Sequence, residues 1–194
     1  MRLNVGDKAP YFQMVDVKGE TQTPVGDGKY PTLLSFYRHA GCPPCNLRVR
    51  ELILAKQELD RNGLRLIGVF ESPAKSIRRD LYHAEVPFPI LPDPERHLYE
   101  HYSVTPSLLG FVKSFLLSPG YSIKAIFKHG YLPKFVEATT MMPADFLIAP
   151  DGTIKLAYYA KDINDYLPFE KLYAALADIS LTGQMVMPST THQQ

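Results

Sequence analysis

The chain has 194 residues, of which 45% are hydrophobic and 21% are charged, and its formal net charge is +1. This composition is that of a globular protein, so it excludes intrinsic disorder and a fibrous repeat, and the length predicts one domain with a sizeable core. The balanced charge provides no basic field for nucleic acid or anionic lipid, so we expect neither as a partner.

The N-terminal region lacks the apolar segment of a signal peptide. The most apolar stretch, 107–123, is interrupted by Lys113, Pro119 and Gly120. A membrane-spanning helix needs about 20 apolar residues, so we expect a soluble cytoplasmic protein that does not bind membranes. In that reducing compartment, two closely spaced cysteines indicate chemistry or a metal rather than a structural disulfide.

Hydrophobic periodicity and turn residues predict alternating strands and helices. In chain order, strands are expected at 32–37, 64–70, 88–91, 145–149 and 153–159, and helices at 43–60, 72–84, 96–102 and 168–179. Ser72 is expected to cap the second helix, with Pro73 at its first helical position. The last two strands flank the turn 150–152 and form a hairpin. This order predicts an α/β fold with a mixed sheet, parallel in one part and antiparallel at one edge.

Two segments do not follow this alternation. Residues 105–142 contain an apolar helix and scattered aromatic residues. They form either a lid or docking surface over the cysteines, or an insertion packed on the sheet edge. Residues 181–194 are polar and are expected to be a flexible tail, which leaves one domain from residue 1 to 180.

The cysteines give the clearest chemical signal, in the sequence Cys42-Pro43-Pro44-Cys45 between a predicted buried strand and a predicted amphipathic helix. A cysteine just before a helix meets the positive end of the helix dipole, and such sites lower a thiol pKa from about 8.5 to roughly 3.5–7.5. Cys45 lies inside the first turn, so we expect it to be more buried and to keep a higher pKa. Cys42 is therefore the predicted attacking thiol and Cys45 the predicted resolving thiol. Neither proline has an N–H, so the Cys45 N–H is the expected backbone donor to the Cys42 sulfur.

Positive charge surrounds this motif. Between residues 30 and 50 there are three arginines, Arg38, Arg48 and Arg50, and no acid. His39 would add a charge when protonated. An electropositive thiol site fits this pattern, although Arg48 and Arg50 can equally point into solvent.

Metal binding is an alternative use of such residues. A structural cysteine pair or half of a zinc site would also fit the spacing, but zinc takes four ligands and the chain has no second cysteine pair. His97 and His101 could form a metal-binding helix face, although a solvated face is the simpler interpretation. His83 and His129 are isolated in the sequence. We expect neither a metal nor an organic cofactor.

The chain resembles the redoxin group of the thioredoxin-like superfamily, which contains the alkyl hydroperoxide reductase/thiol-specific antioxidant and peroxiredoxin-like proteins. Four segments carry the resemblance: VGDKAPYF at 5–12, FYRHAGCPPC at 36–45, FPILPDP at 88–94 with HYSV at 101–104, and PADFLIAPDGTI at 143–154. The resemblance implies a thioredoxin-like fold, a mixed central sheet flanked by helices, with an N-terminal extension and an insertion before the C-terminal hairpin.

Within that group, peroxiredoxins carry Pro-x-x-x-Thr/Ser-x-x-Cys before the reactive cysteine, and an arginine three residues before the hairpin phenylalanine. The corresponding positions here hold Ser35, His39 and Pro143. Arg38 is a candidate substitute for the missing arginine. Pro143 instead resembles the cis-proline of thioredoxin-like oxidoreductases, which would expose the backbone of Met142 to an extended substrate. An ordinary proline at the start of a strand is the alternative.

We therefore expect a thiol–disulfide oxidoreductase and antioxidant of the redoxin type, with a Cys42–Cys45 dithiol/disulfide couple and with Arg38, Met142 and Pro143 contacting the substrate. The partners would be a protein disulfide and an upstream thiol reductant. The alternative is a peroxiredoxin-like hydroperoxide reductase, in which a small hydroperoxide oxidises Cys42 and Cys45 resolves the product.

A copper-binding or metal-delivery module is a third interpretation. Copper chaperones on this fold use two cysteines and a distant histidine, for which His129 is the candidate here. Their cysteines are usually spaced one residue wider than Cys42 and Cys45. The sequence carries no signal for an oligomeric state.

Overall fold

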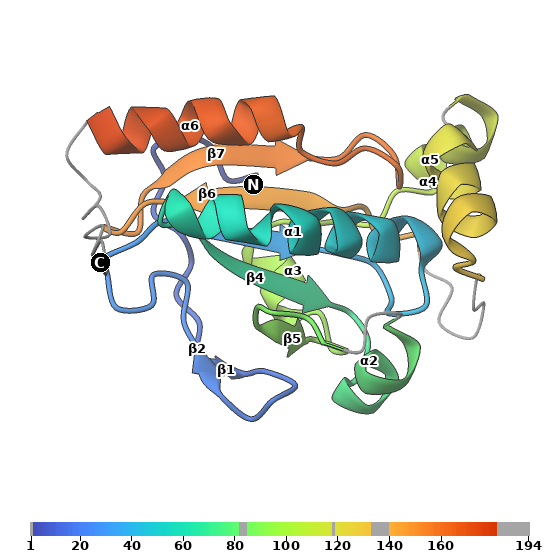
Figure 1. The fold of residues 1–194 in the computed structure, drawn as a ribbon, viewed down its shortest axis with the longest axis horizontal. Coiled ribbons are helices and arrows are strands. Elements are labelled where there is room, and N and C mark those ends of the chain that lie inside the picture. Colours follow the sequence, from blue (N-terminus) through green and yellow to red (C-terminus); the bar gives the residue numbers. More distant parts are fainter. Residues whose placement is uncertain (1, 82–84, 118, 133–139, 182–194) are drawn as a thin grey trace, which may run out of the picture.

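A five-stranded mixed sheet forms the centre of the protein (Figure 1). The structure, a computed structural model, describes residues 2–81, 85–117, 119–132 and 140–181. The strands, in sheet order, are β5 (Ile90–Pro92), β4 (Arg65–Phe70), β3 (Thr32–Phe36), β6 (Ala144–Ile148) and β7 (Ile154–Tyr159). β3, β4 and β5 run parallel, whereas β6 pairs antiparallel with β3 and β7 antiparallel with β6. The predicted mixed sheet is therefore confirmed, with the hairpin at one edge.

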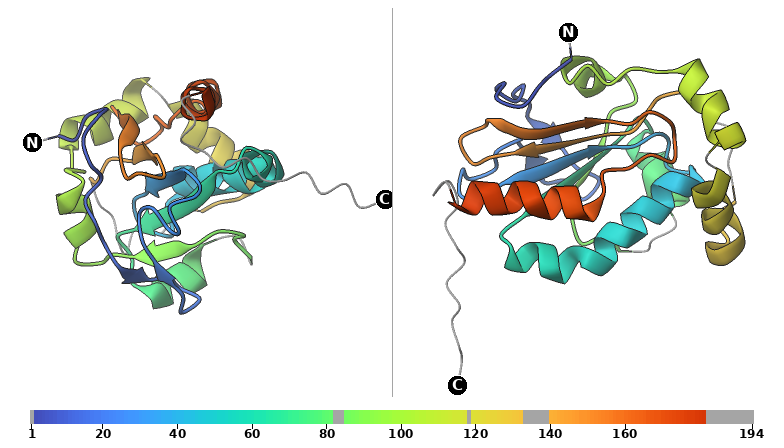
Figure 2. Two further views of the ribbon diagram at one scale, coloured as in Figure 1. Left: turned by 90° about the vertical axis from the view of Figure 1, so that its left-hand side faces the viewer. Right: turned by 90° about the horizontal axis from the view of Figure 1, so that it is seen from above.

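Helices cover both faces of the sheet because alternate residues of each buried strand face opposite sides. On one face, Leu33 packs with α1 (Pro43–Arg61) and α6 (Phe169–Leu181), which lie side by side in Figure 2. On the other face, Leu34 packs with Leu98 and Tyr99 of α3 (His97–His101). The loop that follows β3 leads directly into α1. Both cysteines therefore lie in the core on the face of the sheet that α1 and α6 cover.

The second predicted helix differs from its expected form. α2 covers only Ala74–Asp80, its N-cap is Pro73, and it has no side-chain cap. The Ser72 hydroxyl instead accepts a hydrogen bond from the Ala40 N–H at 3.0 Å. Because both residues are buried at the end of the sheet, this bond satisfies a loop amide that solvent cannot reach. The predicted end of the helix near Ala84 lies outside the described residues.

A small hairpin of β1 (Met14–Val15) and β2 (Thr21–Gln22) precedes the sheet and was not predicted. The two strands have two residues each, which is too short for a periodicity argument. At the other end of the chain, Leu181 is the last residue of α6, and the rest of the predicted tail lies outside the described residues.

The segment after α3 forms α4 (Leu108–Leu117), α5 (Pro119–Ile123) and a π-helix, η1 (Lys124–Lys128). It packs on the first turns of α1: Ala125 and Tyr131 contact Leu47, and the Tyr121 hydroxyl donates to Glu51 at 2.9 Å. Figure 1 shows this segment at the end of the sheet where α1 begins. The segment also reaches the β6–β7 side of the sheet, because α4 approaches Met142 and Lys161 at Gly110, and the Ser114 hydroxyl accepts a hydrogen bond from the Ile163 N–H at 3.0 Å. No helix of the described ranges is both long and apolar enough to cross a membrane.

Candidate active site

The strand–loop–helix unit of β3 and α1 positions the two cysteines. Cys42 is the N-cap of α1, and Pro43 and Pro44 occupy the first two helical positions. Proline is tolerated there because the N–H groups of a first helical turn have no intrahelical partner. Asn46 closes the loop, since its side-chain amide donates to the carbonyls of Ala40 at 2.6 Å and Cys42 at 3.1 Å. Cys42 and Cys45 therefore face each other across one turn, as the spacing predicted.

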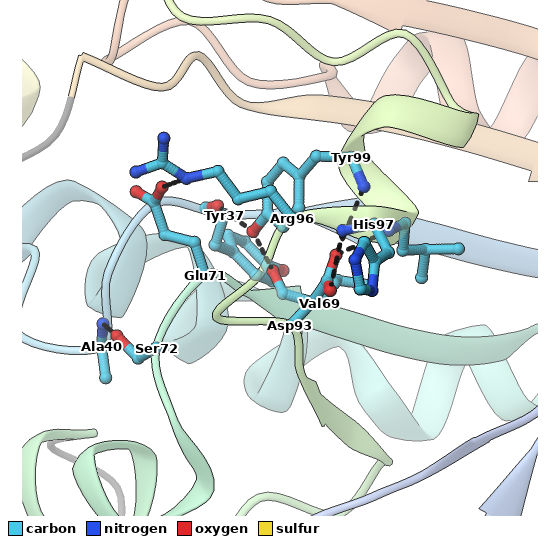
Figure 3. A network of polar contacts seen from close by, with 10 residues as sticks. Tyr37, Ala40, Val69, Glu71, Ser72, Asp93, Arg96, His97 and Tyr99 are labelled. Carbon is cyan, nitrogen blue, oxygen red and sulfur yellow. Dashed lines mark hydrogen bonds and ion pairs between the residues drawn. The ribbon is translucent and has the colours of Figure 1, made fainter.

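Buried polar contacts fix the loop between β3 and α1 to the neighbouring strands (Figure 3). The Tyr99 hydroxyl donates to the carbonyl of Tyr37 at 2.6 Å and lies 3.1 Å from that of Val69. The Asp93 carboxylate accepts backbone N–H bonds from the start of α3 and so fixes the helix that carries Tyr99. On the adjacent loop, the Glu71 carboxylate pairs with Arg96 at 3.0 Å. The chain segment that leads from β3 to Cys42 is thus held by α3 through Tyr99. α3 is in turn held by Glu71, which follows β4.

The two cysteines are free thiols in close contact. The Cys45 thiol donates to the Cys42 sulfur with the two Sγ atoms 2.7 Å apart, and the Arg38 guanidinium donates to Cys42 Sγ at 3.5 Å. Both cysteines are 0% exposed. The expectation that Cys42 is the less buried of the pair is therefore wrong: the loop and its covering side chains enclose both sulfurs equally.

The environment separates the pKa values of the two thiols. Burial by itself raises the pKa of Cys42, but the Cys45 thiol, the positive charge of Arg38 and the Cys45 backbone N–H together lower this pKa to about 7. Burial raises the pKa of Cys45, and the neighbouring Cys42 raises it further. The predicted roles of attacking and resolving thiol are consistent with this asymmetry.

Of the positive residues near the motif that the structure describes, Arg38 is the one that donates a hydrogen bond to the Cys42 thiol. Arg48 is buried on α1, where it donates to the Leu167 carbonyl at 2.8 Å and lies 3.6 Å from the Glu51 carboxylate. It neither points into solvent nor donates to the cysteines. His39 is buried and Arg50 is half-buried.

The peptide bond between Met142 and Pro143 is trans, because the described residues contain no cis peptide bond. The predicted cis-proline is therefore wrong. The Pro143 carbonyl accepts a hydrogen bond from the Ala160 N–H at 3.0 Å, which extends the β6–β7 pairing by one step. Pro143 is thus an ordinary proline at the start of β6, and this pairing occupies the backbone next to Met142. Met142 and Pro143 line a cavity of about 360 Å³ together with Thr105 and Lys161.

The histidines do not join the cysteines. His97 lies 3.6 Å from Glu95, and His129 stacks on Tyr131 with 5.8 Å between ring centroids. His83 lies outside the described residues. Across the part of the chain that the structure describes, no group of three or more histidine, cysteine, aspartate or glutamate residues is arranged to hold a metal ion.

Two aromatic residues of the site escaped prediction. The Phe111 ring of α4 lies against the Arg38 guanidinium, 5.2 Å from its central carbon, and Tyr166 packs in the same core cluster as both cysteines. Neither belongs to a local motif, and each is far from the cysteines in sequence. For Phe111, the lid interpretation of 105–142 was the only signal in the sequence. For Tyr166 the sequence offered none, because it has the pattern of an ordinary core residue.

Comparisons with known proteins agree with this fold. Over 104 residues, 53% of the chain, 31% are identical to a candidate peroxiredoxin, bcp, of Haemophilus influenzae, and the match spans 66% of that protein, slightly under two thirds of its length. Peroxidoxin BcpB of Mycobacterium tuberculosis superposes with a TM-score of 0.65 at 16% identity, over 92% of this chain and 99% of the other. A candidate thiol:disulfide interchange protein, DsbE, of Chlorobium tepidum gives 0.60 at 18% identity, over 90% and 99%.

At these identities the structural likeness shows the fold alone, and it confirms the predicted thioredoxin-like architecture. The sequence match is more specific, because residues 5–157, which are more than half of the chain and include both cysteines, match the AhpC/TSA family. The chain therefore belongs to the AhpC/TSA family.

Proposed function

We propose that this protein is a thiol-dependent peroxidase that reduces a small hydroperoxide, with Cys42 as the peroxide-reactive thiol and Cys45 as the resolving thiol. One observation carries the proposal: the fully buried Cys42 sulfur lies between the Arg38 guanidinium at 3.5 Å and the Cys45 sulfur at 2.7 Å. An enclosed sulfur favours an oxidant of a few atoms over a disulfide on a folded protein. Membership of the AhpC/TSA family supports the same chemistry.

The reaction has three steps: oxidation of Cys42, formation of the disulfide with Cys45, and reduction of that disulfide. The Cys42 thiolate attacks one peroxide oxygen, so that an S–O bond forms, the O–O bond breaks, and water or an alcohol leaves after taking up a proton. This leaves Cys42 as a sulfenic acid. The Cys45 thiolate then attacks the Cys42 sulfur, an S–S bond forms, and the S–O bond breaks as water leaves. An external thiol reductant returns the two electrons and restores both thiols.

Arg38 has the role that the missing peroxiredoxin arginine would have. Its charge favours the Cys42 thiolate, and its N–H groups are close enough to polarise a peroxide oxygen bound to that sulfur. Phe111 holds the guanidinium in place through its ring. Met142 and Pro143 remain proposed substrate contacts, although the lining of their cavity includes neither cysteine nor Arg38.

Thiol–disulfide exchange is the second candidate. The two-residue spacing of the cysteines at the start of α1 favours it, as does the absence of a hydroxyl residue at position 39. In this case Cys42 would attack a disulfide and Cys45 would release the product thiol. The trans peptide bond before Pro143 removes one argument for this candidate.

We also propose that the described part of the segment 105–142, which comprises residues 105–117, 119–132 and 140–142, is a lid rather than an inert insertion. Its described part contacts the site twice, through Phe111 on Arg38 and through Tyr121, whose ring lies 5.4 Å from that of Tyr166. Movement of this segment would admit the substrate and then the thiol reductant.

A cytoplasmic location fits a protein that depends on a reducing compartment.

The cysteine variants test the proposed roles. Cys42→Ser is expected to abolish hydroperoxide reduction, whereas Cys45→Ser is expected to react with one equivalent of peroxide and accumulate Cys42 sulfenic acid. The measurement is peroxide consumption with a thiol reductant, together with the intact mass of the protein after one equivalent. An active Cys42→Ser variant would refute the mechanism.

A further inference from the structure

Tyr166 is a buried tyrosine on the loop between β7 and α6, and it is fixed from three directions. Its ring lies 5.4 Å from that of Tyr121 on α5, and the Arg48 guanidinium of α1 lies 5.9 Å from the ring centroid. The next residue, Leu167, is held at both backbone groups: its carbonyl accepts from Arg48 at 2.8 Å, and its N–H donates to Asp145 at 3.3 Å. The side chain of Tyr166 is therefore placed by α1, α5 and β6 together.

The hydroxyl of Tyr166 is buried without a completed hydrogen bond among the described residues. A buried hydroxyl in this condition is unfavourable and is rare in native proteins, so its position calls for an explanation. The ring belongs to the core cluster of both cysteines. Burial raises the pKa of Cys45, and the Tyr166 hydroxyl acts in the opposite direction and lowers it.

We propose that the Tyr166 hydroxyl is the hydrogen-bond donor that activates the resolving thiol, completing its bond when negative charge forms on the Cys45 sulfur. This inference rests on the proposed function and adds a residue to its second step. The reduced thiol does not need the bond, whereas the attacking thiolate does. A donor that is held in place but not engaged in the ground state stabilises the charged form selectively.

The phenol suits this role as a donor and not as a base. Burial, followed by the nearby cysteines, raises the pKa of Tyr166 well above its ordinary value, so the hydroxyl keeps its proton. The proton of Cys45 leaves to solvent or to the departing hydroxide, and the new S–S bond replaces the S–O bond of the sulfenic acid. No electron is exchanged with Tyr166.

The test compares the lifetime of the Cys42 sulfenic acid in the wild type and in Tyr166→Phe. Reduced protein is mixed with one equivalent of hydrogen peroxide and quenched at increasing times, and intact mass separates the sulfenic acid from the disulfide. Tyr166→Phe is expected to form the sulfenic acid at an unchanged rate and to resolve it about tenfold more slowly, the order expected for one hydrogen bond to a charged group. The matched control is Tyr102→Phe, which removes the hydroxyl of a buried tyrosine in the core on the other face of the sheet, bound to the Pro10 carbonyl rather than to sulfur.

Equal resolution rates in Tyr166→Phe and the wild type would overturn the inference, as would an equal slowing in Tyr102→Phe. Failure of the proposed function looks different, because peroxide would then oxidise the wild-type Cys42 slowly.

A second measurement does not depend on peroxide. In a Cys42→Ser background, titration of the thiolate ultraviolet absorbance is expected to give a Cys45 pKa about one pH unit higher when Tyr166→Phe is added. An unchanged Cys45 pKa would contradict the role of Tyr166.

Discussion

The reactivity of Cys42 depends on a balance between burial and nearby donors. Removing the sulfur from water disfavours its thiolate and so raises the pKa of Cys42. The Arg38 charge, the Cys45 thiol and the Cys45 backbone N–H lower it again, which gives a pKa of about 7. The cysteine spacing predicted the asymmetry and the backbone donor from the general behaviour of helix N-termini. It could not predict which of three arginines supplies the charge, because that depends on how the loop before Cys42 folds back.

Replacing Arg38 tests this balance. Arg38→Met keeps the length of the side chain and removes its charge, so the pKa of Cys42 should rise, and the rate of peroxide oxidation at pH 7 should fall by about tenfold. The sign follows from the thiolate, which is the reactive form and becomes scarcer at a given pH when the pKa rises. The measurement is the pH profile of Cys42 oxidation, whose midpoint should move upward from about 7. An unshifted midpoint would show that Arg38 is not the dominant positive group. Arg48→Met is the matched control, because Arg48 is also a buried arginine near the motif but bonds to the Leu167 carbonyl rather than to sulfur.

The strands and long helices followed from sequence because each buries a periodic apolar face against the same sheet. The short elements did not. Ser72 has the side chain of a helix cap, yet it bonds to Ala40 across the sheet end, since a buried amide there has no other partner. Pro143 shows the same limitation, because a likeness of sequence predicted a cis bond, whereas the bond is trans and Pro143 pairs with Ala160 as an ordinary strand residue.

The lid proposal predicts the effect of a larger residue at Gly110 in α4. A Cβ on Gly110 would lie 2.9 Å from the Lys161 carbonyl oxygen and 2.8 Å from Met142 Sδ, both closer than real contacts allow. Gly110→Ala should therefore push α4 away from the site, lower the free energy of unfolding by about 1–3 kcal/mol, and speed alkylation of Cys42. The measurements are urea unfolding and the rate of reaction with iodoacetamide.

Gly120 in α5 provides the control, because a Cβ there would meet nothing within 4 Å. Gly120→Ala should leave alkylation unchanged and keep or slightly increase stability, since alanine favours a helix. If Gly110→Ala destabilises the protein without exposing Cys42, the segment is a packed insertion and the lid proposal is wrong.

In the whole molecule, residues from distant parts of the sequence meet at one end of the sheet. The β3–α1 unit supplies the thiols, and α3 holds the preceding loop through Tyr99. Phe111 lies against Arg38, and Tyr166 packs in the core cluster that buries both cysteines. The order of strands and helices predicted where the thiols lie. It did not predict the enclosure, which depends on contacts between segments more than 60 residues apart in the printed sequence. That enclosure is the reason for preferring a small oxidant.

The most direct test of the peroxidase assignment is the rate at which stoichiometric hydrogen peroxide oxidises Cys42 in the reduced protein, compared with a simple free thiol at the same pH. Rapid quenching and intact mass would follow the reaction, with Cys42→Ser as the blank. We expect oxidation faster than that of the free thiol by several orders of magnitude, because the thiolate, Arg38 and the enclosed site act together. A rate close to that of the free thiol would contradict the assignment and leave disulfide exchange as the function of the Cys42–Cys45 pair.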